Sequence, residues 1–201
     1  MNVKRLFELA FSTSGLLFLS PLLLIISLCI LFESGGPIIY RQKRVGKDWK
    51  RFMIYKFRTM SFQNTEDVKI CRSSSDKRVT RVGKYLRKYK LDEIPQLFNV
   101  LKGDMSIVGP RPQLPRFVEY HSSMYKDILK IKPGITDLAS IKFRNESSLL
   151  ENEADNVEKV YLNKILPKKL IYNKEYLEKR GFFYDIGLVF KTLYSVIFKG
   201  R

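Results

Sequence analysis

The sequence is poor in cysteine, histidine and acidic residues. Its 201 residues include two cysteines, one histidine and 20 acidic residues against 37 lysines and arginines. Cys29 lies in an apolar run and Cys71 in a polar stretch, a spacing that excludes a disulfide framework and a cysteine-based zinc site and favours a reducing compartment. His121 has no cysteine or histidine companion nearby, so we expect it to cap a helix or to lie at the surface.

The shortage of acid leaves a net charge of +17 on the chain. A charge of this size indicates an anionic partner, which could be nucleic acid, an anionic membrane surface or a phosphorylated substrate. The length suits one domain, or one domain with a small appendage, and neither an internal repeat nor a linker interrupts it.

No charged residue lies between Leu16 and Phe32. A helix needs roughly 20 apolar residues to cross a membrane, so this run is long enough to span one, or nearly so. No secretory cleavage site is visible, and a dense basic cluster between Arg41 and Arg51 resists translocation, so we expect the chain after residue 33 in the cytoplasm. Ser20-Pro21 stands in mid-run, where proline removes a backbone donor and kinks a helix. A kinked spanning helix and a hairpin that dips into one leaflet both fit this pattern.

The remainder alternates between short strands and helices. Residues 37–60 predict a β-hairpin, residues 61–77 a polar loop, and residues 79–90 and 94–102 two helices, the second with Pro95 in its first turn and Gly103 at its end. Residues 109–112 and 132–136 predict two rigid loops, and residues 149–178 a charged helical region. Residues 182–198 predict a helix that lies either in the core or at a membrane interface.

The strongest chemical pattern is the pair Asp92-Glu93 at the expected start of a helix. Free N–H groups and the positive end of the helix dipole make such a position suitable for phosphate. A carboxylate can attack phosphorus and form an aspartyl phosphate. Basic residues surround the pair in sequence: Arg78, Arg81, Lys84, Arg87, Lys88 and Lys90 before it, and Arg111 between two prolines after it.

Each part of this pattern also has a simpler interpretation. An Asp-Glu pair at a helix start commonly caps the helix, a basic stretch is commonly a solvated face, and Gly109-Pro110-Arg111-Pro112 alone is commonly a stiff loop.

Six segments together resemble the bacterial sugar transferase family, the small monotopic phosphoglycosyl transferases that initiate glycoconjugate synthesis. The segments are Ser20–Pro21, Tyr55–Met60, Asp76–Gly83, Leu91–Ser106, Val108–Pro112 and Lys132–Thr136, in the order of that family. The sequence departs from it at Asp137 and Leu138, where family members often have glycine and then tryptophan, and it matches weakly after residue 145. These departures concern the sugar pocket rather than the reaction.

The resemblance implies an α/β fold, mostly α with a short β-hairpin. A re-entrant membrane helix with a break at Ser20 and Pro21 would occupy residues 1–33, and a compact catalytic domain with interfacial amphipathic helices would occupy residues 34–201 on the cytoplasmic face of the bacterial inner membrane. Partners would be a UDP-sugar, undecaprenyl phosphate and membrane phospholipids, with no nucleic acid and with a homodimer as an option.

The resemblance also implies roles for single residues. Asp92 would be the nucleophile that takes the sugar phosphate, Glu93 its partner in a dyad, and Asp92 would bind a magnesium ion that bridges to phosphate. Four basic residues would bind the substrate, with Arg111 at the nucleotide end and Arg87 and Arg144 at phosphate: Lys56, Arg87, Arg111 and Arg144.

Two other classes of function stay open on the sequence. A nucleic-acid binder fits the charge together with 11 tyrosines and 14 phenylalanines, but it has no use for a charge-free apolar run. A non-catalytic, membrane-anchored assembly protein of a polysaccharide system fits the apolar run, but it has no need of Asp92-Glu93. The sequence does not specify the sugar.

Overall fold

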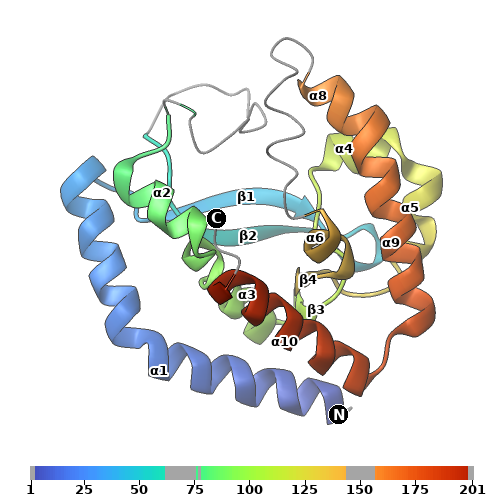
Figure 1. The fold of residues 1–201 in the computed structure, drawn as a ribbon, viewed down its shortest axis with the longest axis horizontal. Coiled ribbons are helices and arrows are strands. Elements are labelled where there is room, and N and C mark those ends of the chain that lie inside the picture. Colours follow the sequence, from blue (N-terminus) through green and yellow to red (C-terminus); the bar gives the residue numbers. More distant parts are fainter. Residues whose placement is uncertain (1–2, 62–75, 77, 144–156, 199–201) are drawn as a thin grey trace.

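The first element is a long apolar helix, α1 (Val3–Ser34), which lies along the outside of the molecule (Figure 1). In the computed structural model, residues 3–61, 76, 78–143 and 157–198 are described. Figure 1 shows that α1 bends partway along its length. Pro21 lies inside the helix and Ser20 Oγ donates to Leu17 O at 2.8 Å. We attribute the bend to this pair, because a missing backbone donor and a hydroxyl bonded to the preceding turn both bend helices.

The predicted β-hairpin is confirmed. Strands β1 (Ile39–Val45) and β2 (Arg51–Phe57) pair antiparallel, with Ile39 opposite Phe57 and Val45 opposite Arg51. A short 3₁₀ turn, η1 (Lys47–Trp49), connects them, and Gly46 N donates to Lys50 O at 2.8 Å to close the loop.

Both predicted helices of the middle region are present. Helix α2 (Arg81–Lys88) is capped by Thr80, whose hydroxyl accepts from Gly83 N. Helix α3 (Gln96–Lys102) follows Pro95 and ends at Gly103, whose φ of 88° lies in the left-handed region that glycine adopts without strain. Between them lies the 3₁₀ turn η2 (Leu91–Glu93).

A second small sheet corrects the sequence analysis. Strands β3 (Ser106–Val108) and β4 (Gly134–Thr136) pair in parallel, so the prediction of a loop is wrong for residues 134–136. Gly134 is required here, because a Cβ on it would lie 2.1 Å from Gly109 N. The close approach of Gly109 and Gly134 therefore brings together two distant segments, the one that precedes Arg111 and the one that precedes Asp137.

Helices make up most of the remaining described chain, which agrees with the expected mostly helical α/β class. His121 stands between two of them, as the last cap of one and the first cap of the next, but its side chain makes no hydrogen bond that caps either; its Nε2 lies 2.8 Å from Leu162 O. Residues 149–156 of the predicted charged helical region lie outside the described residues, and residues 157–179 are helical. The elements are α4 (Pro115–Tyr120), α5 (Ser122–Ile128), α6 (Leu138–Lys142), α8 (Val157–Val160), the π-helical turn η3 (Tyr161–Ile165), α9 (Leu166–Lys179) and α10 (Phe182–Phe198).

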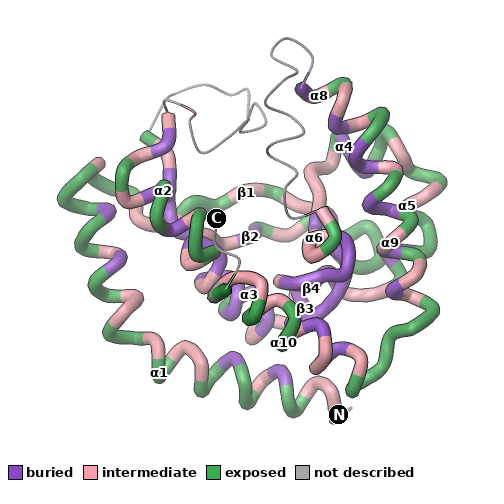
Figure 2. Tube along the Cα trace, viewed as in Figure 1, coloured by how far each residue is buried: buried purple, intermediate pink, exposed green. Residues whose placement is uncertain are grey.

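Three apolar clusters hold these elements together, and Figure 2 shows buried residues concentrated around β3 and β4. The first joins β1 to α4, α5 and α9, and the second joins β2 and α3 to the small sheet, α6, α9 and α10. The third packs Ile26 and Ile30 of α1 against Phe57 and Leu86. The C-terminal half of α1 is therefore part of the core on one of its faces.

The beginning of α1 is also bonded to the body of the protein. Arg5 donates to Val100 O at 2.8 Å and to Leu101 O at 3.1 Å, at the C-terminal end of α3. Lys4 Nζ donates to Asp185 Oδ2 of α10 at 2.6 Å.

The end of α1 is held by α2 and by the chain after β2. Glu33 accepts from Arg81 N at 2.7 Å and from Val82 N at 3.0 Å, which satisfies two free donors at the start of α2. Arg58 donates to Ser34 O at 2.9 Å and to Gly36 O at 2.8 Å. Both ends of the long apolar helix are therefore bonded to one body.

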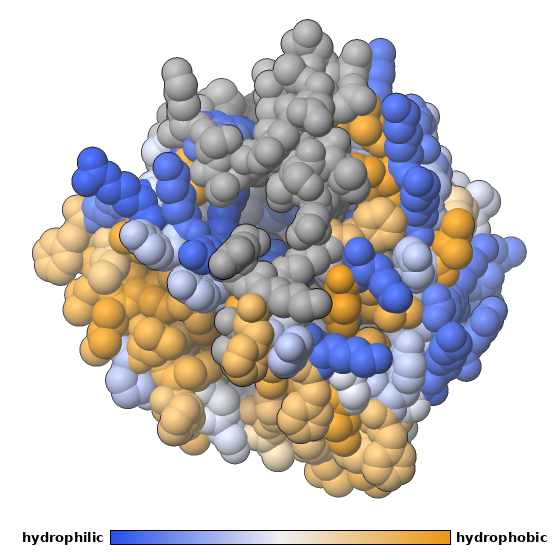
Figure 3. All heavy atoms as spheres, viewed as in Figure 1, coloured by the Kyte–Doolittle hydropathy of each residue, from blue (hydrophilic) through white to orange (hydrophobic). Residues whose placement is uncertain are grey.

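One face of the molecule is apolar. Figure 3 shows hydrophobic side chains gathered over α1 and α10, whereas hydrophilic side chains gather over α9. Phe18 and Phe32 of α1 and Phe183 of α10 are each 85% exposed. Helix α1 is long and apolar enough to cross a membrane by length and composition.

Candidate active site

The pair Asp92-Glu93 lies inside the protein rather than at a solvated helix end. Lys90 follows α2 with φ of 56° and ψ of 20°, a left-handed conformation that turns the chain inward. Asp92 and Glu93 then sit on η2 and are 7% and 8% exposed. The pair lies in the 3₁₀ turn that leads into α3, and the simpler interpretation, that it caps the helix, does not hold, because α3 begins at Gln96 and no side chain of the described residues caps it.

Glu93 is clamped between two cations. Lys56 Nζ of β2 lies 2.7 Å from Glu93 Oε1, and Arg111 Nη1 donates to Glu93 Oε2 at 3.1 Å while its Nη2 donates to Oε1. Burial alone would raise the pKa of Glu93, but Arg111, Lys56 and then Lys90 outweigh it and hold the pKa well below its ordinary value. In return, the Glu93 charge raises the pKa of Arg111 above its ordinary value. Glu93 therefore stays ionised.

Asp92 lies in a different environment from its neighbour. Its Oδ1 is buried and has no hydrogen-bond partner among the described residues. Burial raises the pKa of Asp92 and the Glu93 charge raises it further, while nearby cations offset part of this rise: Lys56, Lys90 and Arg87. Two adjacent carboxylates whose pKa values are shifted in opposite directions are typical of a catalytic pair.

Arg111 is held from its backbone as well as its side chain. Gly134 N donates to Pro110 O at 3.0 Å, and Gly109 N donates to Thr136 O at 3.0 Å, which fixes the loop that carries Arg111. Asp137, a departure from the family pattern, caps α6 through Ser140 N at 2.8 Å, and its other oxygen accepts from Arg111 N at 3.4 Å.

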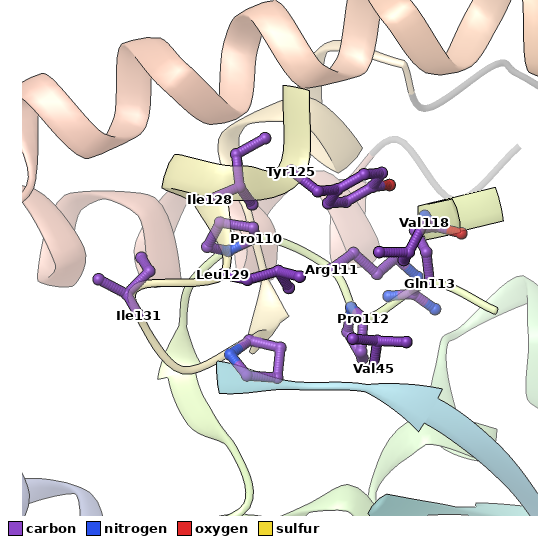
Figure 4. A pocket seen from close by; sticks show the side chains of 11 residues that line it. Val45, Pro110, Arg111, Pro112, Gln113, Val118, Tyr125, Ile128, Leu129 and Ile131 are labelled. Atoms are coloured by element: carbon purple, nitrogen blue, oxygen red, sulfur yellow. The ribbon is translucent and has the colours of Figure 1, made fainter. Parts of the chain in front are cut away.

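Behind Arg111 lies a small pocket, lined from β1, from the Pro110–Gln113 loop and from α4 and α5 (Figure 4). Its open space is about 10 Å³, which is room for one water molecule rather than a nucleotide. Arg44 lies nearby, and burial, helped by the Arg111 charge, lowers the pKa of Arg44 to about 10. This pocket is therefore too small to hold a nucleotide donor.

The predicted site residues are brought together in part. Lys56, Glu93 and Arg111 are in contact, and Arg87 and Lys90 lie close enough to Asp92 to affect its pKa. Arg144 lies outside the described residues. Of the other basic residues of the sequence pattern, Arg78 is paired with Asp76 at 2.7 Å, and Arg81, Lys84 and Lys88 are exposed on α2.

Two supporting residues were missed by the sequence analysis. Asn99 is fully buried and ties α3 to β2, accepting from Tyr55 N at 3.0 Å and donating to Met53 O at 2.8 Å. Thr59 accepts from Arg87 Nε at 2.8 Å. Both lie inside the segments that carried the family resemblance, so their position in those segments was the available signal.

A metal ion could be held by Asp92. The described residues contain no group of three histidine, cysteine, aspartate or glutamate side chains suited to a metal. Magnesium does not need one, because it is commonly bound by one or two carboxylates together with substrate phosphates and water. Asp92 Oδ1, which no described residue bonds, therefore fits a magnesium ion that arrives with a phosphorylated substrate.

The chain is similar to known proteins over nearly its whole length. The sequence profile of the family described as "Bacterial sugar transferase" matches residues 1–199. A "UDP-glucose:undecaprenyl-phosphate glucose-1-phosphate transferase" of Klebsiella pneumoniae is 38% identical over 199 residues, which cover 97% of this chain and 40% of that protein. The "Exopolysaccharide production protein ExoY" of Rhizobium meliloti is 32% identical over 208 residues, covering 96% of this chain and 84% of that protein.

A further relative differs in the sugar that its name gives. The "Putative undecaprenyl-phosphate N-acetylgalactosaminyl 1-phosphate transferase" of Bacillus subtilis is 44% identical over 119 residues, covering 59% of this chain and 66% of that protein. The chain spans about 40% of the length of the Klebsiella pneumoniae and Escherichia coli glucose-1-phosphate transferases that it matches.

Proposed function

The chain belongs to the bacterial sugar transferase family, and we propose that it transfers a sugar-1-phosphate from a UDP-sugar to undecaprenyl phosphate and releases UMP. The observation that carries the proposal is the buried Asp92, whose Oδ1 has no partner among the described residues and which lies among cations beside an ionised Glu93. Relatives named as undecaprenyl-phosphate sugar phosphotransferases support it.

The reaction proceeds in two displacements at one phosphorus atom. An Asp92 oxygen attacks the phosphorus that bears the sugar, a bond from that oxygen to phosphorus forms, and the bond to the UMP oxygen breaks, so that UMP leaves with the electron pair. A phosphate oxygen of undecaprenyl phosphate then attacks the same phosphorus. The bond to Asp92 breaks, the carboxylate is restored and the product is a polyprenyl diphosphate sugar.

The clamp around Glu93 prepares the site for this chemistry. Because Glu93 stays ionised, it holds Lys56 and Arg111 in place beside Asp92 without a rearrangement during the reaction. Arg87 and Lys90 add positive charge next to Asp92, where the phosphates of the donor would lie. We propose that Arg111 and Lys56 also contact the donor, with Arg87 at phosphate.

We also propose that a magnesium ion binds at Asp92. When bound, it would offset the repulsion between the carboxylate and the phosphate oxygens. Asp92 would hold it through Oδ1, which has no other partner among the residues that the structure describes, and donor and water would supply the remaining ligands.

The membrane arrangement that we propose is a re-entrant α1, with the rest of the chain on the cytoplasmic face of the bacterial cell membrane. A helix that crosses the membrane would place its two ends on opposite sides, yet Lys4 and Arg5 at one end and Glu33 at the other bond to the same body. The exposed apolar side chains of α1 and α10 would enter the leaflet, and the +17 charge favours an anionic surface. Asp92 would then stand near the lipid substrate.

The test is an assay of the nucleotide released from a panel of UDP-sugars in lipid discs, with magnesium and undecaprenyl phosphate. We expect UMP from one class of donor, dependent on the lipid and lost in Asp92→Asn. Release of UDP would mean an ordinary glycosyl transferase. Neither release nor donor binding would favour a non-catalytic assembly protein.

A further inference from the structure

Arg87 is held by a hydroxyl that lies deep in the protein. Its Nε donates to Thr59 Oγ1 at 2.8 Å, and Thr59 is 7% exposed. Arg87 belongs to α2, and a long segment of chain separates α2 from Thr59. The positive charge of Arg87 lowers the pKa of Asp92. The contact therefore joins the chain after β2 to the site.

Thr59 is itself fixed from several sides. Its carbonyl accepts from Thr80 N at 3.1 Å, and a Cβ added to Gly83 would lie 2.2 Å from Thr59 O, so α2 packs directly on this backbone. The preceding residue, Arg58, donates from its backbone N to Ile38 O at 2.9 Å and from its side chain to Gly36 O at 2.8 Å. A hydroxyl on so constrained a backbone can set the direction of a longer side chain.

We propose that Thr59 is a positioning residue that aims the Arg87 guanidinium at the donor phosphate beside Asp92. Arginine loses considerable rotamer freedom when it is ordered, and one hydrogen bond to Nε fixes the plane of its fork before the substrate binds. Thr59 acts through Arg87 and touches neither the substrate nor the reacting atoms. The inference rests on the proposed function.

A purely structural role is the competing explanation, in which the Thr59 hydroxyl only fastens α2. The chain offers a matched residue for that role. Thr80 Oγ1 accepts from Gly83 N at 2.9 Å. This hydroxyl therefore caps α2 through a backbone N–H of the helix, whereas the Thr59 hydroxyl bonds the Arg87 side chain. Loss of this cap should lower stability and leave the folded enzyme's kinetics unchanged.

The experiment compares kcat/KM for UMP release in Thr59→Val, Thr59→Ser and Thr80→Val, together with their unfolding midpoints. We expect Thr59→Val to lower kcat/KM roughly 10- to 100-fold, because small misplacements of a binding group cost that much. Thr59→Ser keeps the hydroxyl and should restore most of the rate. Thr80→Val should lower the midpoint without lowering kcat/KM, and equal kinetic losses in Thr59→Val and Thr80→Val would overturn the proposal.

A double-mutant cycle with Arg87→Ala separates the two explanations further. If Thr59 acts through Arg87, adding Thr59→Val to Arg87→Ala costs no further activity. The same fold-loss with and without Arg87 would mean a structural role and would overturn the inference while leaving the proposed function intact. No UMP release by the wild-type protein would contradict the proposed function, and this inference with it.

Discussion

The Glu93 clamp should dominate the stability of the site, and Glu93→Gln measures it. The substitution keeps the shape of the side chain but leaves Lys56 and Arg111 without their counter-charge. The side chains of these two residues are 20% and 28% exposed and that of Glu93 is 10% exposed, so water replaces the lost contacts poorly. Breaking a buried pair of this kind costs about 3 kcal/mol, at the lower end of measured losses, because a glutamine oxygen can still accept one hydrogen bond.

A pair at the surface provides the matched control. Arg51 Nη2 lies 3.2 Å from Glu119 Oε1, and both side chains are 62% exposed. Glu119→Gln should cost less than about 1 kcal/mol. For a chain of this size, 1 kcal/mol corresponds to about 2–4 °C, so Glu93→Gln should lower the unfolding temperature by about 6–12 °C and Glu119→Gln by at most about 4 °C.

The stability that Glu93 contributes should also depend on pH. Because the folded state lowers the pKa of Glu93 below 4.5, the stability that it contributes is present above pH 4.5 and is lost as the pH falls through the folded-state pKa. The difference in unfolding free energy between the wild type and Glu93→Gln should therefore be full at pH 7 and shrink in acid. Equal midpoints for Glu93→Gln and Glu119→Gln, or a difference that does not change with pH, would refute the clamp.

Asp92→Asn should abolish UMP release yet raise the free energy of unfolding at pH 7 by about 1–3 kcal/mol, because it removes a buried carboxylate with one oxygen that has no partner in the described part of the chain. This gain should vanish as the pH falls below 3.8, and a lower midpoint at pH 7 would contradict it. The acid limb of kcat/KM should move to higher pH in Lys56→Met and to lower pH in Glu93→Gln, because the Lys56 charge lowers the pKa of Asp92 and the Glu93 charge raises it; pH–rate profiles showing no shift, or opposite shifts, would contradict this. Gly83→Ala should cost about 1–3 kcal/mol or abolish folding, since its Cβ would strike Thr59 O. By contrast, the Cβ of Gly187→Ala meets no atom of the described residues within 4 Å, and this change should be neutral or stabilising in a denaturation series. Single cysteines at Val3 and Lys43, in a background without Cys29 and Cys71, should be labelled from the same side of sealed vesicles if α1 re-enters, and labelling from opposite sides would mean that it crosses.

Local chemistry made much of the fold predictable. The hairpin follows from two apolar strands around a turn, and α3 follows from Pro95 before it and a left-handed Gly103 after it. The small parallel sheet could not be predicted in this way. Its strands have three residues each and depend on the close approach of Gly109 and Gly134, which arises from distant parts of the chain.

The candidate site was only partly visible in the sequence. The family resemblance brought Asp92, Glu93 and Arg111 together, but it did not indicate that Arg111 and Lys56 bind Glu93, or that Asp92 Oδ1 finds no partner among the described residues. The residues of the apolar run by themselves left a spanning helix and a re-entrant one open, and only the family resemblance favoured re-entry. The contacts of Lys4 and Glu33 that tie both of its ends to one body are long-range and leave no local pattern.

The central claim is that Asp92 becomes covalently attached to the sugar phosphate, and a labelling experiment tests it most directly. The purified protein, with magnesium and without undecaprenyl phosphate, is incubated with a UDP-sugar that carries radioactive phosphorus next to the sugar, then quenched, digested and mapped. The account predicts label on the peptide that contains Asp92, its release when undecaprenyl phosphate is added, and no label in Asp92→Asn. Label on another residue, or lipid-dependent UMP release with the label passing directly to the lipid and never to the protein, would contradict it.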